Sequence, residues 1–133
     1  MGNPEGVEQR LDYLADLHVQ YFHLMKVLRA REGANDGGYA VLDYCDVDPA
    51  LGTWSDLEYL ADELHERGVS LCLDLVMNHT SDQHPWFVES RQDRTNPRHD
   101  WYVWNDHDQL YRDARIIFVD TETSNWTYDA QRG

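Results

Sequence analysis

Residues 69–77 read VSLCLDLVM and are followed directly by Asn78 and His79. The run is apolar except for Ser70 and Asp74. A short, nearly continuous apolar run of this kind is typical of a strand in a parallel sheet that is buried on both faces. Because ligands bind at the carboxyl ends of such strands, Asn78 and His79 stand where a binding site would form.

A helix is expected just before this strand. Ser55 and Glu58 fit a capping box, so we expect the helix to begin at Ser55. Gly68 stands where a left-handed residue would end it. The apolar positions of this segment share one helical face: Leu57, Leu60, Ala61 and Leu64.

The first part of the chain repeats the order of helix and strand. Apolar residues spaced three and four apart predict an amphipathic helix over residues 7–17, ending near His18. Residues 19–25 are short, apolar and aromatic, as in a buried strand. Residues 29–49 are polar and rich in glycine, and we expect a functional loop there. This order predicts an α/β fold with right-handed crossovers.

The composition changes after His79. Residues 80–113 are polar and aromatic, and residues 114–119 could add one strand of a small excursion domain. The chain then stops without completing a strand and helix unit. We therefore expect part of a larger domain over residues 1–79 and the beginning of a second domain over residues 80–133.

The charge limits the choice of partners. The formal net charge is −14, with 11 Lys and Arg against 25 Asp and Glu, which argues against nucleic acid and anionic membranes as partners. No apolar run approaches the length of about 20 residues that spans a bilayer, and no export signal is recognisable, so we expect a cytoplasmic protein. Cys45 and Cys72 form neither a zinc motif nor a disulfide framework.

Two groups of polar residues are candidates for a site. We expect Asp74, inside a strand, to be structural and to hold Asn78, His79 or a neighbouring loop through backbone N–H groups. His79 is either a satisfied histidine at the strand end or a functional one. Asp36 and Tyr39 flank a pair of glycines; they form either a carbohydrate-binding corner or a tight turn with a core tyrosine.

These motifs together resemble glycoside hydrolase family 13, the α-amylase family. Residues 74–79 (DLVMNH) resemble the first conserved region of the family, residues 38–44 (GYAVLDY) its characteristic loop, and residues 48–53 (DPALGT) the segment before its second helix. The resemblance implies a partial (β/α)8 barrel, about strands 2 to 3 with helices 1 to 2, plus the start of an inserted subdomain B.

Two groups of enzymes within the family compete. Residues 29–41 resemble amylosucrases, which act on sucrose, and Ala40 agrees with them in place of the usual acidic residue. From Asn78 onward the sequence resembles trehalose synthases, which isomerise maltose by glucosyl transfer. The C-terminal matches are longer and favour the trehalose synthase type.

The resemblance also implies roles for individual residues. Tyr39 would stack on the glucose that is attacked, Asp36 would help to wall its pocket, and His79 would hydrogen-bond the same sugar. Asn78 matches a position that binds calcium in many α-amylases; no other cofactor is implied. The substrate would be a small molecule such as maltose or sucrose, or an α-glucan.

The same resemblance predicts that this chain does not catalyse the reaction alone. The nucleophile and the acid/base residue lie on later strands of the family barrel and have no counterpart here, and Asp36 and Asp74 do not replace them. Two other hypotheses remain: a self-standing carbohydrate-binding module that uses Asp36 and the aromatic residues, and an acidic interaction domain without sugar chemistry.

Overall fold

The computed structural model describes residues 4–33, 37–117 and 119–132. The chain divides into two compact units, unit 1 over residues 1–84 and unit 2 over residues 85–133, and each is described by itself. The predicted domain boundary after His79 falls near the end of unit 1. Within the described ranges, no helix is long and apolar enough to cross a membrane.

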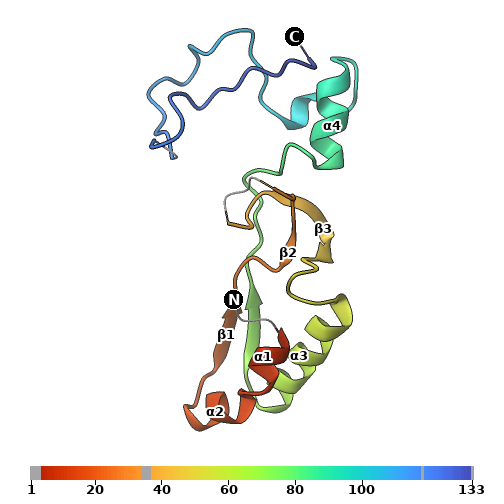
Figure 1. The fold of residues 1–133 in the computed structure, drawn as a ribbon, viewed down its shortest axis with the longest axis vertical. Helices are drawn as coiled ribbons and strands as arrows, with labels where there is room; N and C mark the ends of the chain where they lie inside the picture. The colour runs from red at the N-terminus through yellow and green to blue at the C-terminus, as the bar shows by residue number, and fades with distance from the viewer. Residues whose placement is uncertain (1–3, 34–36, 118, 133) are drawn as a thin grey trace. The chain divides into compact units, whose positions relative to one another are not determined.

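Unit 1 consists of short helices and strands around α3 (Trp54–Glu66) (Figure 1). The described elements are, in chain order, α1 (Pro4–Glu8), α2 (Leu11–Asp16), β1 (Tyr21–Leu24), β2 (Leu28–Ala30), β3 (Val41–Val47), α3 (Trp54–Glu66) and β4 (Ser70–Leu73). They form two small sheets, in which β1 pairs with β4 and β2 pairs with β3.

The sheet of β1 and β4 is parallel, as the sequence predicts. Phe22 pairs with Leu71 and His23 with Cys72. The other part of the prediction, burial on both faces, is wrong for the described residues, because Ser70 and Cys72 are exposed. The apolar core lies on the face that carries Phe22 and Leu71, so only that face is covered.

Helix α3 begins earlier than predicted. Its N-cap is Thr53, whose hydroxyl accepts from the Asp56 backbone N–H at 3.3 Å. The Asp56 carboxylate accepts from the Thr53 backbone N–H at 2.7 Å and so completes a capping box. The expectation that Ser55 caps the helix is therefore wrong, because the shorter Asp56 side chain supplies the reciprocal bond. Gly68 ends the segment with φ +72°, as predicted.

Helix α3 connects two apolar clusters. Leu60 and Leu64 are fully buried in the first cluster, together with Leu11 and Val69. Leu57 belongs to the second, with Val27 and Val47. The predicted apolar face of this helix is thereby confirmed at its three leucines. Because β1 and β4 contribute Phe22, Leu24 and Leu71 around these clusters, the helix holds the parallel strand pair in place.

The predicted helix over residues 7–17 is two helices in the structure. The backbone N–H of Arg10 donates to the Val7 carbonyl at 2.8 Å, which makes a tight turn between α1 and α2. The predicted end near His18 is confirmed, since His18 has φ +56° and leaves the helical region.

The predicted loop over residues 29–49 contains a second sheet. Strands β2 and β3 pair antiparallel, with irregular register around Arg29. Val41 and Val47 are buried at the two ends of β3. The loop prediction is wrong here because Asp43 and Asp46 give this strand a polar composition that hides its apolar ends.

Unit 2 contains α4 (Pro85–Gln92) and the 3-10 helix η1 (His99–Trp101) in its described part. Trp104 stacks on Phe87 at a centroid distance of 5.4 Å and lies under the Arg132 guanidinium at 4.3 Å. Its indole N–H donates to Oγ of the fully buried Ser90 at 2.9 Å. The strand predicted over residues 114–119 is not formed at residues 114–117 and 119, which the structure describes as turns and irregular backbone.

Candidate functional site

Three polar side chains meet at one edge of the parallel sheet. Asp74 and Tyr39 were singled out in the sequence, and His23 was not. His23 lies in β1 and Asp74 directly follows β4, and parallel strands bring their carboxyl ends to the same edge. His23 Nε2 lies 2.7 Å from Asp74 Oδ1. The hydroxyl of Tyr39, which precedes β3, donates to Asp74 Oδ2 at 3.1 Å. Asp74 therefore joins three segments that are distant in sequence.

The contacts of Asp74 favour its ionised form. The hydrogen bond from His23 is the main cause that lowers its pKa; burial acts to raise the pKa, and hydrogen bonds from Tyr39 and the Lys26 backbone lower it further. A carboxylate with a low pKa and both oxygens engaged is a weak base, and it is no acid near neutral pH. We therefore assign Asp74 no proton transfer.

The partners of Asp74 agree only in part with those predicted. It lies just after the strand, not inside it. The Lys26 backbone, in the loop between β1 and β2, donates to it, which agrees with the predicted backbone bond from a neighbouring loop. The side chains of His23 and Tyr39 also donate to it, and the prediction named neither. The sequence offered no signal for His23, because an alternating strand position does not show which side chain will face it.

His79 contacts the backbone carbonyl of the same tyrosine, Tyr39. Its Nε2 lies 3.2 Å from the Tyr39 carbonyl oxygen, which can only accept, so this nitrogen carries the hydrogen. Its Nδ1 lies 3.3 Å from Asn78 Nδ2 and accepts from that amide. Both ring nitrogens have partners, so a sugar hydroxyl that hydrogen-bonds His79 has to replace one of them.

The glycine pair shapes the segment that carries Tyr39. Gly37 and Gly38 have φ +81° and +101°, a region that other residues rarely adopt. A Cβ atom on Gly38 would lie 3.3 Å from Lys26 Cβ, so this glycine also allows Lys26 to approach. The Lys26 ammonium then lies over the Tyr39 ring, 5.7 Å from its centroid. Asp36 lies outside the described residues.

Tyr44 is a supporting residue to which the sequence analysis gave no role. Its hydroxyl lies 2.6 Å from the Val76 carbonyl and 3.0 Å from the His79 carbonyl. It therefore fixes the turn that carries Asn78. Its ring packs against the buried His84 at a centroid distance of 5.6 Å. Its place in the motif of residues 38–44 was the only available signal.

Calcium at Asn78 gains no support from a cluster of metal-ligating side chains among the described residues. Calcium takes about six to eight oxygen ligands, commonly including carboxylates. Within the described part of the chain, no three His, Cys, Asp or Glu side chains gather where they could hold a metal ion. Calcium at Asn78 therefore stays a prediction of the resemblance, and nothing below relies on it.

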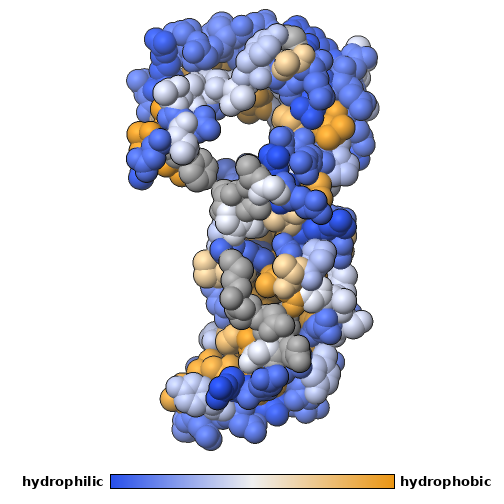
Figure 2. Space-filling view, in the orientation of Figure 1, coloured by the Kyte–Doolittle hydropathy of each residue, from blue (hydrophilic) through white to orange (hydrophobic). Residues whose placement is uncertain are grey.

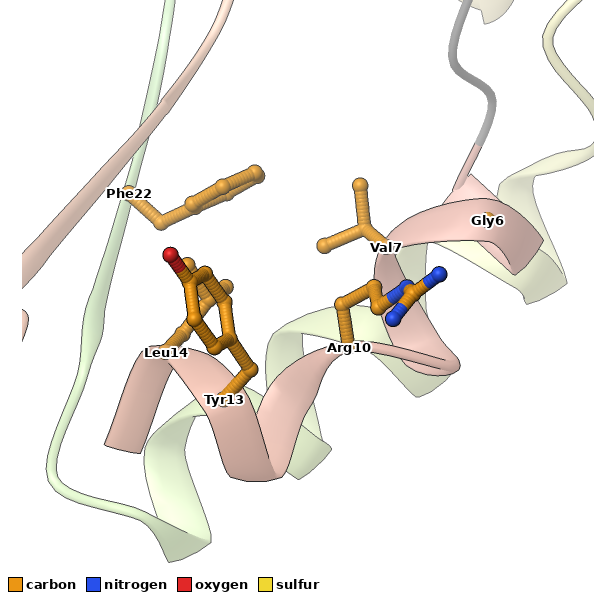
Figure 3. Close-up of a pocket in the computed structure, with 6 residues that line it drawn as sticks. All are labelled: Gly6, Val7, Arg10, Tyr13, Leu14 and Phe22. Carbon is orange, nitrogen blue, oxygen red and sulfur yellow. The ribbon is translucent and has the colours of Figure 1, made fainter. Parts of the chain in front are cut away.

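An apolar hollow of about 380 Å³ lies between α1, α2 and β1 (Figure 3). Phe22 and Val7 face each other across it, and none of the predicted site residues lines it. Other apolar side chains of unit 1 are exposed, among them Leu17 and Met25. Figure 2 shows hydrophobic residues, in orange, at the surface of the molecule. The hollow is separate from the residues around Asp74 and has little polar chemistry to offer a sugar.

Comparison with known proteins shows the family. The profile of the α-amylase catalytic domain matches residues 1–133. A trehalose synthase of Pimelobacter sp. (strain R48) is 48% identical over 132 residues, which are 99% of this chain and 23% of that protein. Trehalose synthase/amylase TreS of Mycobacterium tuberculosis (strain CDC 1551 / Oshkosh) is 47% identical over 131 residues, 98% of this chain and 22% of that protein. The chain belongs to the α-amylase family, glycoside hydrolase family 13.

Solved structures agree with this assignment. Isomaltulose synthase (PalI) from Klebsiella sp. LX3 matches with a TM-score of 0.72 and 36% identity, over 80% of this chain and 19% of that one. Such neighbours are barrel enzymes of the same family, whose members are glycoside hydrolases and glucosyltransferases that act on small sugars or glucans. The chain spans less than a quarter of the length of the curated relatives named above, which it covers to 23% and 22%.

Proposed function

We propose that this chain is the part of an α-glucoside-active enzyme that binds one glucose unit of an α-linked sugar. In this proposal β1 and β4 are barrel strands 2 and 3, α3 is the second barrel helix, and unit 2 begins the inserted subdomain. The observation that carries the proposal is the anchoring of Tyr39, whose hydroxyl is bound by Asp74 and whose carbonyl is bound by His79.

An aromatic ring held at both ends suits a sugar. The faces of a pyranose carry C–H groups that pack on an aromatic ring, while its hydroxyls need hydrogen-bond partners around the rim. Tyr39 would supply the ring, and His79 a donor or acceptor at the edge. Asp36 would contribute a carboxylate to the same pocket, as the family resemblance implies.

In this proposal the chain binds the sugar but does not cleave its glycosidic bond. Retaining glycosidases need two carboxyl groups about 5 Å apart across the scissile bond. Asp74 has both oxygens occupied by donors and a lowered pKa, so it fits an acceptor of hydrogen bonds better than a nucleophile or an acid. The nucleophile and the acid/base residue would belong to later barrel strands.

We favour a maltose-active, trehalose synthase type of enzyme over an amylosucrase type. The support is that the two trehalose synthase relatives match 99% and 98% of the chain, including residues 29–41, where the sequence resembles amylosucrases.

Two measurements on the purified chain test this proposal together. Isothermal titration with maltose should show binding, whereas the anionic polymer heparin at the same concentration should show none, because the net charge is −14. Incubation with maltose or sucrose should release no glucose and form no trehalose. Absent maltose binding, or measurable turnover of either sugar by the chain alone, would contradict the proposal.

A further inference from the structure

His23 occupies a place in the site that neither the motifs nor the comparisons assign to it. Its side chain is 51% exposed, yet its Nε2 atom lies 2.7 Å from Asp74 Oδ1, a short distance for an N–H···O bond. Because an ionised carboxylate only accepts, Nε2 carries the hydrogen in this contact. Bonds of this kind to a charged acceptor are stronger than neutral ones.

This contact fixes the orientation of the Asp74 carboxylate. The torsion that rotates a carboxylate about its last bond has broad minima and sets no direction by itself. With Oδ1 bound by His23, the other oxygen is directed to the Tyr39 hydroxyl at 3.1 Å. The outer end of the Tyr39 ring is thus placed by a chain of two hydrogen bonds that begins in β1.

The inner end of the same residue is fixed independently. The Tyr39 carbonyl accepts from His79 Nε2 at 3.2 Å and from the Val41 backbone N–H at 3.0 Å. The ring therefore has a fixed backbone, and the bond between its hydroxyl and Asp74 restrains its tip. Loss of the His23 contact would release the tip and leave the backbone in place.

We propose that His23 is a positioning residue that holds the Tyr39 ring in its sugar-binding orientation through Asp74. This inference rests on the proposed function, in which Tyr39 packs on glucose. A merely structural ion pair at this exposed position would contribute little and would leave Tyr39 unaffected. The two roles therefore differ in what happens to Tyr39 when His23 is changed.

The test compares three variants of the full chain. His23→Ala removes the donor. His23→Gln keeps an N–H group at about the same reach, so it should rescue the function. His65→Ala, at an exposed position in α3, is the matched control for loss of a histidine. Circular dichroism should be unchanged in all three, because the side chain of His23 is half exposed and its removal leaves no buried cavity.

The first readout uses NMR without sugar. In His23→Ala the pKa of the Asp74 carboxyl should rise toward its ordinary value of 3.8, and the Tyr39 ring resonances should shift. His23→Gln and His65→Ala should resemble the wild type. Unchanged Tyr39 resonances and an unchanged Asp74 titration in His23→Ala would overturn the positioning role, whatever the affinity for maltose.

The second readout is maltose binding. His23→Ala should bind maltose about tenfold more weakly, the order that one charge-assisted hydrogen bond contributes, with rescue in His23→Gln. Equal affinity in His23→Ala and the wild type would overturn the proposal. A wild-type chain that does not bind maltose would overturn the proposed function instead, and the sugar-free spectra would still decide whether His23 orients Tyr39.

Discussion

Substitution of Leu60 by alanine should loosen the strand pair that carries the candidate site. Leu60 is 0% exposed and lies in the cluster with Leu11, Leu64 and Val69. A Leu→Ala change at a fully buried position costs about 2–5 kcal/mol, from lost burial and from the cavity that remains. A small domain has about 5–15 kcal/mol of stability in total, so this is a large share of it.

Amide hydrogen exchange of β1 and β4 measures this effect. The Ser70 backbone N–H donates to the Gln20 carbonyl at 2.8 Å and reports directly on the strand pair. Its protection should fall by about thirtyfold or more, because each ~1.4 kcal/mol corresponds to a factor of ten. Leu17→Ala, at a side chain that is 57% exposed, is the matched control and should change protection little.

The outcome decides whether α3 holds the sheet together. If Leu60→Ala leaves Ser70 as protected as in the wild type, the strand pair does not depend on the buried face of α3, and the reasoning is refuted. Equal losses in Leu60→Ala and Leu17→Ala would contradict it as well, since burial would then not set the cost.

Three further predictions concern the cap, unit 2 and pH. Thr53→Ala should cost about 1 kcal/mol in urea unfolding and raise amide exchange in the first turn of α3, whereas Thr53→Ser should cost less; equal losses would contradict the capping role. Ser90→Ala should destabilise unit 2 by about 1–3 kcal/mol in tryptophan-monitored unfolding, because the Trp104 N–H loses its acceptor; unchanged unfolding would argue against this bond. Burial lowers the pKa of His84, although nearby Asp43 acts to raise it. As the pH falls, the unfolded chain therefore binds a proton at His84 at a higher pH than the folded chain does. Stability of unit 1 should therefore be lost as pH falls from the ordinary value of 6.5 toward the folded pKa, and His84→Gln should flatten that slope; an identical slope would contradict the assignment.

The elements that could be predicted are those whose signal is local. Helix α3 shows three leucines at helical spacing and a glycine at its end, and β4 lies in a short apolar run that directly follows this glycine. Strand β3 could not be predicted because its residues form contacts only after β2 is brought alongside. The cap lies at Thr53 and not at Ser55 because two overlapping sequences offer a capping box, and the reciprocal bond comes from Asp56.

The same distinction applies to the candidate site. Tyr39, His79 and Asp74 could be singled out because they belong to short motifs. His23 and Tyr44 could not be assigned roles, because their partners are distant in sequence. The bond of His23 to Asp74 spans 51 residues and depends on the parallel pairing of β1 and β4. The bond of Tyr44 to the His79 carbonyl spans 35 residues and depends on the path of β3. Contacts between distant segments are therefore where the structure adds most.

Saturation-transfer NMR with maltose on the wild-type chain, Tyr39→Phe and Tyr39→Ala tests most directly whether this chain holds a glucose unit on Tyr39. The proposal predicts transfer to the sugar C–H protons in the wild type, weaker transfer in Tyr39→Phe, which keeps the ring but loses the hydroxyl bound to Asp74, and none in Tyr39→Ala. Equal transfer in the wild type and Tyr39→Ala would contradict it.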